Sequence, residues 1–193
     1  TAFATREESS IYPDYMDVTI PCNIAPLNFD YTVDGAEKCI TTFEWNGGSA
    51  SFKGAGVRWN MKKWRRMLSE AVGNDIKVTS SALDTAWTIH VSTDSIDFGI
   101  NYRLIEPGYE VYSKMGLYER DLSSFDEYEI MENTRVPGMC INCHTSNRTD
   151  PKQTLFHVRG DKGATVLRID GKTELLNTKT DPTLASCVYP YWH

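Results

Sequence analysis

Short runs of β-prone residues, separated by Gly- and Pro-containing turns, constrain the fold of this 193-residue chain most. Runs rich in Val, Ile, Thr, Tyr and Trp are typical of strands packed on one face. The sequence "NGGS" indicates a hairpin turn between two of these runs. The pattern predicts strands near 28–33, 38–45, 49–53, 75–80, 86–92 and 98–105.

One stretch, "NMKKWRRMLSEAVGN" (60–74), has the spacing of an amphipathic helix. Asn60 is placed to cap its start and Gly73 to end it. We expect its apolar stripe to pack in the core, and it consists of Met61, Trp64, Leu68 and Val72. Its basic residues predict a solvated face rather than a binding patch, and they are Lys62, Lys63, Arg65 and Arg66.

The chain outside this region shows other patterns. The first eleven residues are polar and aperiodic and predict a loose arm, and the prolines up to Pro26 predict an extended segment. The segment 111–136 is predicted to be mostly helical, with Ser124 and Glu127 at capping-box spacing. A loop is expected between Gly138 and Pro151, followed by a short β-meander.

Charge and hydropathy bear on two properties, nucleic-acid binding and membrane crossing. The net charge of −6 and the pI near 5.2 argue against nucleic acid, since phosphate binding requires a basic surface. No run of about 18 apolar residues is present, so the sequence predicts no transmembrane segment.

The cluster Cys140-Ile141-Asn142-Cys143-His144 carries the strongest chemical signal. Haem c attachment requires two thiols at a fixed separation, which bond to the two vinyl groups of one porphyrin, and an imidazole directly after the second thiol. This spacing predicts covalent haem c held by Cys140 and Cys143, with His144 as the proximal iron ligand.

Three other interpretations of the cluster stay open. A structural zinc site needs a second closely spaced pair of ligands, and the other cysteines are far apart. A thioredoxin-like dithiol belongs at the start of a helix in a βαβ unit, and the flanking residues predict a loop instead. An incidental thiol pair, or a strained disulfide between the two, is the remaining interpretation.

The sixth position on the iron is open to a side chain, water or a substrate. We expect His157 to fill it, because thirteen residues after His144 allow the chain to fold around the porphyrin edge. Met115 and His193 are the next choices. His90 is expected to be a half-buried strand residue, and Met139 is too close to Cys140 in sequence.

Three cysteines remain outside the motif. Haem c is assembled outside the cytoplasm, where disulfides persist, so a bridge between Cys22 and Cys39 is an expectation. Cys187 would then be free, or paired outside the chain.

Several long phrases resemble a family of exported Bacteroidetes proteins: "YPDYMDVTIPCNIAPLNF", "YRLIEPGYEVYSKMGLYERDLSSFDE", "CINCHTSN", "FHVRG" and "LLNTKTDPTLASCVYPYWH". In that family a segment with one Cys-x-x-Cys-His motif precedes a TolB-like, WD40-like β-propeller. The resemblance implies haem attachment at Cys140, Cys143 and His144. It also implies export, often as a lipoprotein, and a β-propeller or other envelope subunit as partner. The "YPYWH" phrase resembles the opening of the first blade, which makes His193 suspect as a ligand, and the propeller itself is absent from this sequence.

The sequence therefore predicts an α+β fold. Residues 1–20 would be an extended arm, 21–110 a β-sandwich-like domain with one covering helix, and 111–193 a haem c-binding segment with a C-terminal β-meander. The expected function is electron transfer with a redox partner protein in the periplasm or at the outer-membrane surface, rather than catalysis. The alternatives are an envelope binding or assembly module with structural haem, and a small haem enzyme or sensor with an open sixth site.

Overall fold

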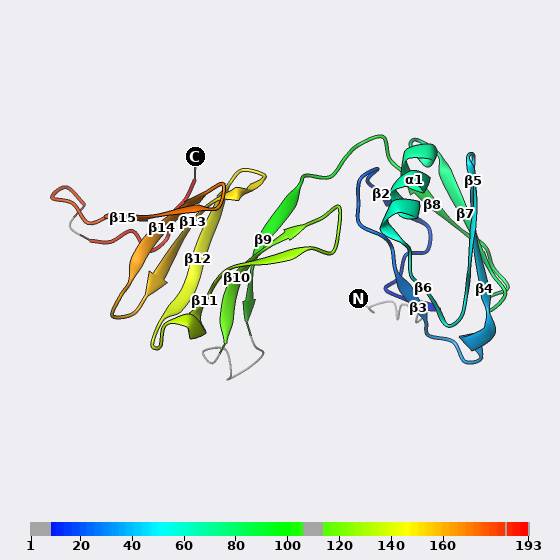
Figure 1. Cartoon of the computed structure of the whole chain (residues 1–193), viewed down its shortest axis with the longest axis horizontal. Helices are drawn as coiled ribbons and strands as arrows, with labels where there is room; N and C mark the ends of the chain where they lie inside the picture. Colours follow the sequence, from blue (N-terminus) through cyan, green and yellow to red (C-terminus); the bar gives the residue numbers. More distant parts are fainter. Residues whose placement is uncertain (1–8, 106–113, 184, 193) are drawn as a thin grey trace, which may run out of the picture. The chain divides into compact units, whose positions relative to one another are not determined.

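The computed structural model describes residues 9–105, 114–183 and 185–192, without the side chain at position 142. The chain forms two compact units, Thr1–Ile96 and Asp97–His193, which are described separately (Figure 1). Most of their regular structure is β-strand, and α1 is the one α-helix among the described residues. The predicted α+β class is therefore wrong, and the fold is predominantly β. No helix in the described part of the chain is long and apolar enough to cross a membrane.

The first unit contains two sheets. Within the described residues, the larger sheet has the order β2-β8-β7-β4-β5 and is antiparallel except for the parallel pair β2–β8. Its strands are β2 (Val18–Ile20), β8 (Trp87–Val91), β7 (Asp75–Ser80), β4 (Ile40–Trp45) and β5 (Gly48–Lys53). The smaller sheet has the order β1-β3-β6, formed by β1 (Ile11–Tyr12), β3 (Phe29–Tyr31) and β6 (Gly56–Val57). A short 3-10 helix, η1 (Ala36–Lys38), precedes β4.

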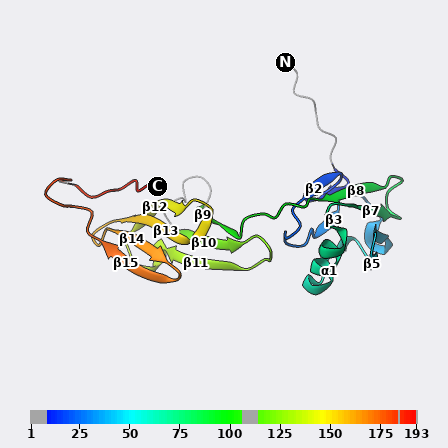
Figure 2. The same cartoon turned by 90° about the horizontal axis from the view of Figure 1, so that it is seen from above.

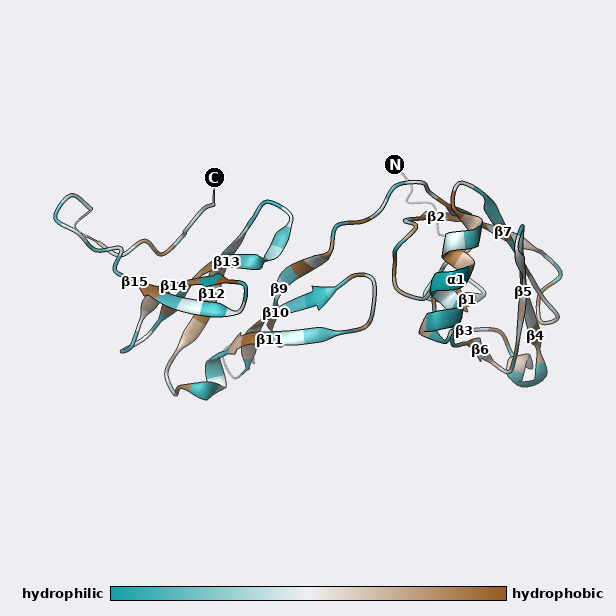
Figure 3. Cartoon of the chain, turned by 45° about the horizontal axis from the view of Figure 1, so that its top comes forward, coloured by the Kyte–Doolittle hydropathy of each residue, from teal (hydrophilic) through white to brown (hydrophobic). Residues whose placement is uncertain are grey.

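Helix α1 (Met61–Ala71) confirms the helical pattern. The Asn60 side chain accepts hydrogen bonds from the backbone N–H groups of Lys62 and Lys63, and Gly73 adopts a φ of 73° just beyond the helix. The helix carries both hydrophilic and hydrophobic residues (Figure 3). Its buried stripe differs in part from the predicted one and consists of Trp64, Met67, Leu68 and Ala71. Val72 is 38% exposed because the helix has already ended there.

The second unit also contains two antiparallel sheets (Figure 2). The three-stranded sheet has the order β11-β10-β9, formed by β9 (Gly99–Ile105), β10 (Met115–Asp121) and β11 (Glu127–Glu132). The four-stranded sheet is an up-and-down meander of β12 (Cys140–Asn147), β13 (Asp150–Arg159), β14 (Ala164–Ile169) and β15 (Lys172–Leu176). The predicted β-meander is present, with β12 as an additional strand.

Two local predictions in this unit are wrong. The segment 111–136 was expected to be mostly helical, but its described part forms β10, β11 and a 3-10 turn, η3 (Asn133–Arg135). Ser124 does not cap a helix, since its Oγ accepts the Asp126 N–H within the β10–β11 turn at 3.1 Å. The expected loop 138–151 instead contains β12 and the start of β13.

The two units divide between Ile96 and Asp97, whereas the sequence placed the boundary at 110. Strand β9 belongs to the second unit because it pairs along its full length with β10. Strands β1 and β2 lie in the predicted arm 1–20, and Ile11 is only 1% exposed. The described part of the arm is thus built into both sheets of the first unit, through β1 and β2.

The interior of the second unit has an apolar part and a polar part. The apolar cluster consists of Leu117, Ile141, Phe156, Val158 and Val166. The polar part begins two residues further along β10 and β14, where Glu119 accepts a hydrogen bond from Arg168 at 2.7 Å. Asn101 of β9 donates to Ser146 and Thr154 of the four-stranded sheet. Polar bonds as well as apolar contacts therefore join the two sheets of this unit.

Candidate functional site

The Cys-x-x-Cys-His motif occupies the first half of β12, where the pairing with β13 is irregular. Ile141 pairs with Val158 and His144 with Phe156, so two residues of β12, 142 and 143, oppose the single residue His157. Such an extra residue is a β-bulge, a feature common next to functional sites. The motif thus begins on a regular pair and contains a bulge.

Both thiols of the motif are free and half-buried. The Cys140 Sγ lies 3.9 Å from the Sδ of buried Met115 on β10. Both cysteines also lie near Arg159, which pairs with Cys140 across the ladder. The pKa of Arg159 is raised by its hydrogen bond to Tyr189, and further by Cys143 and Cys140 in their ionised form. Arg159 therefore lies within electrostatic reach of both thiols.

The bulge places the two histidines on different faces of the sheet. His144 is directly opposite Phe156, so their side chains share a face with the apolar cluster. His157 follows Phe156 on β13 and therefore points to the other face. The structure brings the two residues onto neighbouring strands, but it does not place their imidazoles on one side of the ladder.

His157 is buried and held by a neighbouring strand. Its side chain is 7% exposed, and its Nδ1 lies 3.0 Å from the Oγ1 of Thr165 on β14. Burial lowers the pKa of His157, and the nearby Arg159 charge lowers it further. The Thr165 Oγ1 also donates to the Cys187 carbonyl at 3.1 Å. His157 is thus a neutral imidazole at neutral pH with one ring nitrogen engaged by a hydroxyl group.

The other proposed ligands lie at different places. Met115 is next to Cys140, and Met139 packs against the apolar cluster. His90, expected to be an ordinary strand residue, lies on β8 of the first unit with its Nδ1 2.7 Å from Asp75. His193 lies outside the described residues.

The three remaining cysteines are also free thiols. The expected bridge between Cys22 and Cys39 is absent: Cys22 Sγ contacts the Thr93 carbonyl at 3.9 Å, and buried Cys39 Sγ donates to the Gly54 carbonyl at 2.8 Å. Cys187 is exposed, as expected for an unpaired thiol. In the part of the chain that the structure describes, no group of three or more His, Cys, Asp or Glu side chains could hold a metal ion.

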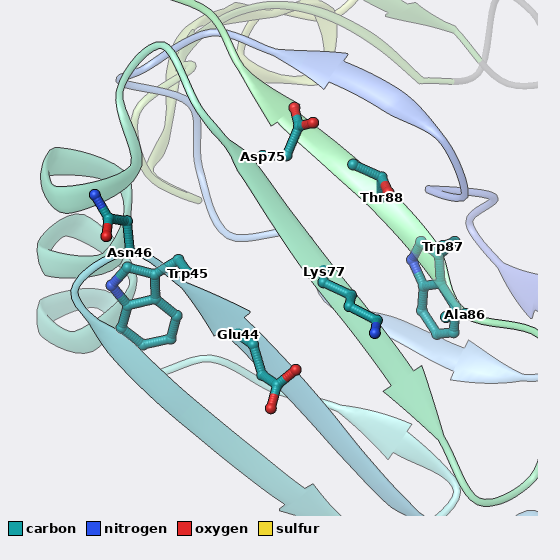
Figure 4. Close-up of a pocket in the computed structure, with 8 residues that line it drawn as sticks. All are labelled: Glu44, Trp45, Asn46, Asp75, Lys77, Ala86, Trp87 and Thr88. Carbon is teal, nitrogen blue, oxygen red and sulfur yellow. The ribbon is translucent and has the colours of Figure 1, made fainter.

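A hollow of about 430 Å³ lies on the outer face of the first unit's large sheet (Figure 4). Glu44, Lys77 and Thr88 form a cross-strand row over β4, β7 and β8 within it. Opposite charges directly across a sheet pair are an ordinary way to stabilise a solvated face. This hollow therefore needs no ligand to explain it.

Sequence reasoning missed the groups around the motif. Arg159, Thr165 and Tyr189 contact or neighbour the predicted site, but each is reached only through strand pairing or the C-terminal segment. No local pattern marks them, although "FHVR" places Arg159 two residues after His157. Comparison with protein-family models, with curated proteins and with solved structures finds no match to this chain.

Proposed function

We propose that this protein carries one haem c and transfers single electrons in the bacterial cell envelope. Cys140 and Cys143 would hold the porphyrin through thioether bonds, and His144 would be the proximal iron ligand. The observation that carries the proposal is the Cys-x-x-Cys-His spacing together with two thiols that are both free and half-buried. When bound, the haem iron supplies the one-electron chemistry.

The arrangement of the two cysteines fits haem c attachment better than the position of His144 does. Both thiols lie near one cation, Arg159, so they are grouped on one part of β12. His144 instead shares a face with Phe156. Attachment therefore requires the chain between Cys143 and His144 to turn, at the place where the bulge already interrupts the ladder.

His157 is the proposed sixth ligand. Iron ligation requires a neutral imidazole, and burial keeps the pKa of His157 low. Thr165 fixes the ring through Nδ1, the role that second-shell groups have for ligating histidines. Because His144 and His157 point to opposite faces, joint ligation also requires β12 to shift relative to β13.

The test is to produce the full chain together with haem c maturation machinery and to measure its absorbance. We expect a Soret band that survives denaturation, because the haem is covalent, and a split low-spin spectrum on reduction. The double variant Cys140→Ala/Cys143→Ala should lose the covalent haem, whereas the control Cys187→Ala should keep it. A matured wild-type chain without a Soret band would refute the proposal.

The sixth ligand is tested by two matched variants. His157→Ala should convert the spectrum to high spin, and Met115→Leu should leave it unchanged. The reverse result would assign the ligand to Met115. High-spin bands in the wild type that shift with carbon monoxide would favour an enzyme or sensor with an open site.

The cell-envelope location and the redox partner protein belong to the same proposal, since haem c is matured outside the cytoplasm. An envelope binding or assembly module is the alternative. A groove of the first unit, lined by β5 and by Lys63 and Arg66 of α1, favours a binding role for that part of the chain.

A further inference from the structure

We infer that the groove between strand β5 and helix α1 binds an extended acidic peptide, which adds to the sheet as a further strand. This groove belongs to the first unit, whereas the Cys-x-x-Cys-His motif belongs to the second. The groove combines an edge strand, an aromatic wall and a cationic rim.

Strand β5 is an edge of the large sheet. Within the described residues it pairs with β4 on one side and has no strand on the other. An edge strand offers a row of unpaired backbone N–H and C=O groups to another chain. Its sequence, GSASFK, has small side chains over the first four positions, so these leave the backbone accessible.

The lining of the groove indicates that the backbone of β5 itself is open to a ligand in the groove. A hollow of about 430 Å³ is lined by every residue from Gly47 to Phe52. Successive side chains of a strand point to opposite faces, so a hollow lined by side chains alone would contact every second residue. Contact with six consecutive residues is instead typical of a hollow that lies along the backbone at the edge of a strand.

Aromatic side chains form the wall of the same hollow. Trp45, Phe52 and Trp59 line it, and the Phe52 and Trp59 rings lie 4.7 Å apart. Trp59 is 7% exposed, and its Nε1 is buried with no hydrogen-bond partner among the described residues. An apolar side chain of a peptide would pack on this wall.

The charge on the rim selects the partner. Lys63 and Arg66 of α1 line the hollow, and both are exposed. The nearby Glu70 carboxylate accepts hydrogen bonds from Arg66 Nε and Trp45 Nε1, each at 2.8 Å, and so offsets the charge of Arg66. These contacts lower the pKa of Glu70. The rim stays net positive because two cations, Lys63 and Arg66, face this one carboxylate. A positive rim beside an open strand edge is complementary to an extended peptide with Glu or Asp among apolar residues.

The test uses the full chain and a fluorescein-labelled heptapeptide of alternating Glu and Val, with binding followed by fluorescence anisotropy. The same peptide with Lys in place of Glu should bind at least tenfold more weakly. Lys63→Glu should weaken binding about fivefold, as expected for reversal of an exposed charge. The matched control Lys62→Glu lies on the same helix turn but does not line the hollow, and should change binding less than twofold.

Backbone pairing is tested on the peptide, so that the protein stays intact. Two peptides are compared, one N-methylated at the odd positions and one at the even positions, so that each lacks the backbone N–H donors of one edge. Only the peptide methylated on the edge that faces β5 should lose binding. Equal binding of the Glu and Lys peptides, or equal effects of the Lys62 and Lys63 variants, would overturn the inference. Tolerance of both methylated peptides would show anion binding without strand addition. Dimerisation that is lost on β5 substitution would show that a second copy of the chain covers this edge.

Discussion

Replacement of Glu119 or Arg168 should destabilise the second unit strongly, because the two form an ion pair in its interior. The Arg168 Nη1 lies 2.7 Å from a Glu119 carboxylate oxygen, and the side chains are 18% and 6% exposed. Removal of one partner of a buried pair typically costs about 3–5 kcal/mol, since the other charge is left without compensation. Arg168 also contacts the Pro151 carbonyl and is the more exposed partner, so its unpaired charge is partly compensated. Glu119→Leu should therefore lower the free energy of unfolding by ~3 kcal/mol, the low end of this range.

Arg168→Met leaves the less exposed carboxylate unpaired and should cost more, ~4–5 kcal/mol. The double variant Glu119→Leu/Arg168→Met removes both charges and should cost much less than the sum of the single changes. We therefore expect a coupling free energy of at least ~2 kcal/mol between the two positions.

Native-state hydrogen exchange with mass spectrometry measures this effect separately in each unit. Because each ~1.4 kcal/mol is tenfold in an equilibrium constant, peptides from β10 and β14 should exchange about 100-fold faster in Glu119→Leu. Peptides from the first unit should not change. Glu174→Gln on exposed β15 serves as the control and should cost less than ~0.5 kcal/mol. Additive single and double effects would refute the idea that the two charges depend on each other.

Three further predictions follow from individual contacts. Asn60→Ala removes the acceptor for two backbone N–H groups of α1 and should cost ~1 kcal/mol in thermal unfolding followed by tryptophan fluorescence, with exposed Asp84→Ala as a neutral control. Burial, with the Glu127 carboxylate bonded to its hydroxyl, raises the pKa of Tyr102 to about 12, so stability should fall between pH 10 and 12 as the unfolded chain loses this proton first. Burial also raises the pKa of Tyr15, Tyr31 and Tyr118, so ultraviolet titration should show several late tyrosines, and part of this late signal should move to lower pH in Glu127→Gln. His157 has a lowered pKa in the folded protein, so the unfolded chain binds this proton first as the pH falls below ~6.5. The free energy of unfolding of the wild type should therefore decrease below this pH, and the decrease should be smaller in His157→Leu.

Where local signals and tertiary contacts agreed, the sequence predicted individual helices and strands correctly, although the predicted fold class was wrong. Helix α1 was predictable because its cap, its periodicity and its terminal glycine all lie within one short segment. Strands β7 and β8 were predictable because their alternating β-prone residues match a sheet with one buried face. Such agreement of local preference with the global fold is what makes a segment readable from sequence.

The prediction for the segment that forms β10 and β11 was wrong because local preferences and tertiary contacts disagree there. It contains Leu, Met and Glu, which favour helices, and a Ser124–Glu127 spacing typical of a helix start. Long-range pairing overrides these preferences: β10 is bonded to β9 on one side and β11 on the other, and Tyr118 stacks on Tyr102 at 5.9 Å. A helix here would leave β9, which pairs with β10 in this sheet, without a strand partner.

The candidate site divides in the same way. The sequence alone predicts a haem site at Cys140, Cys143 and His144, since haem c attachment requires this fixed spacing. It does not contain the register of β12 on β13, which decides the face on which each side chain lies. That register depends on pairs such as Ile141 with Val158, which are set by the apolar cluster.

The bulge therefore links the fold to the proposed function. Without the extra residue, His144 would pair with Leu155 rather than Phe156 and would lie on the same face as His157. A one-residue shift of the strand after Cys143 is thus sufficient to change the face of the proximal histidine. That shift would break the bond from Asn101 to the Ser146 hydroxyl, which holds β12 against β9 at 2.8 Å. If haem attachment uses this shift, loss of the Asn101 bond should ease it.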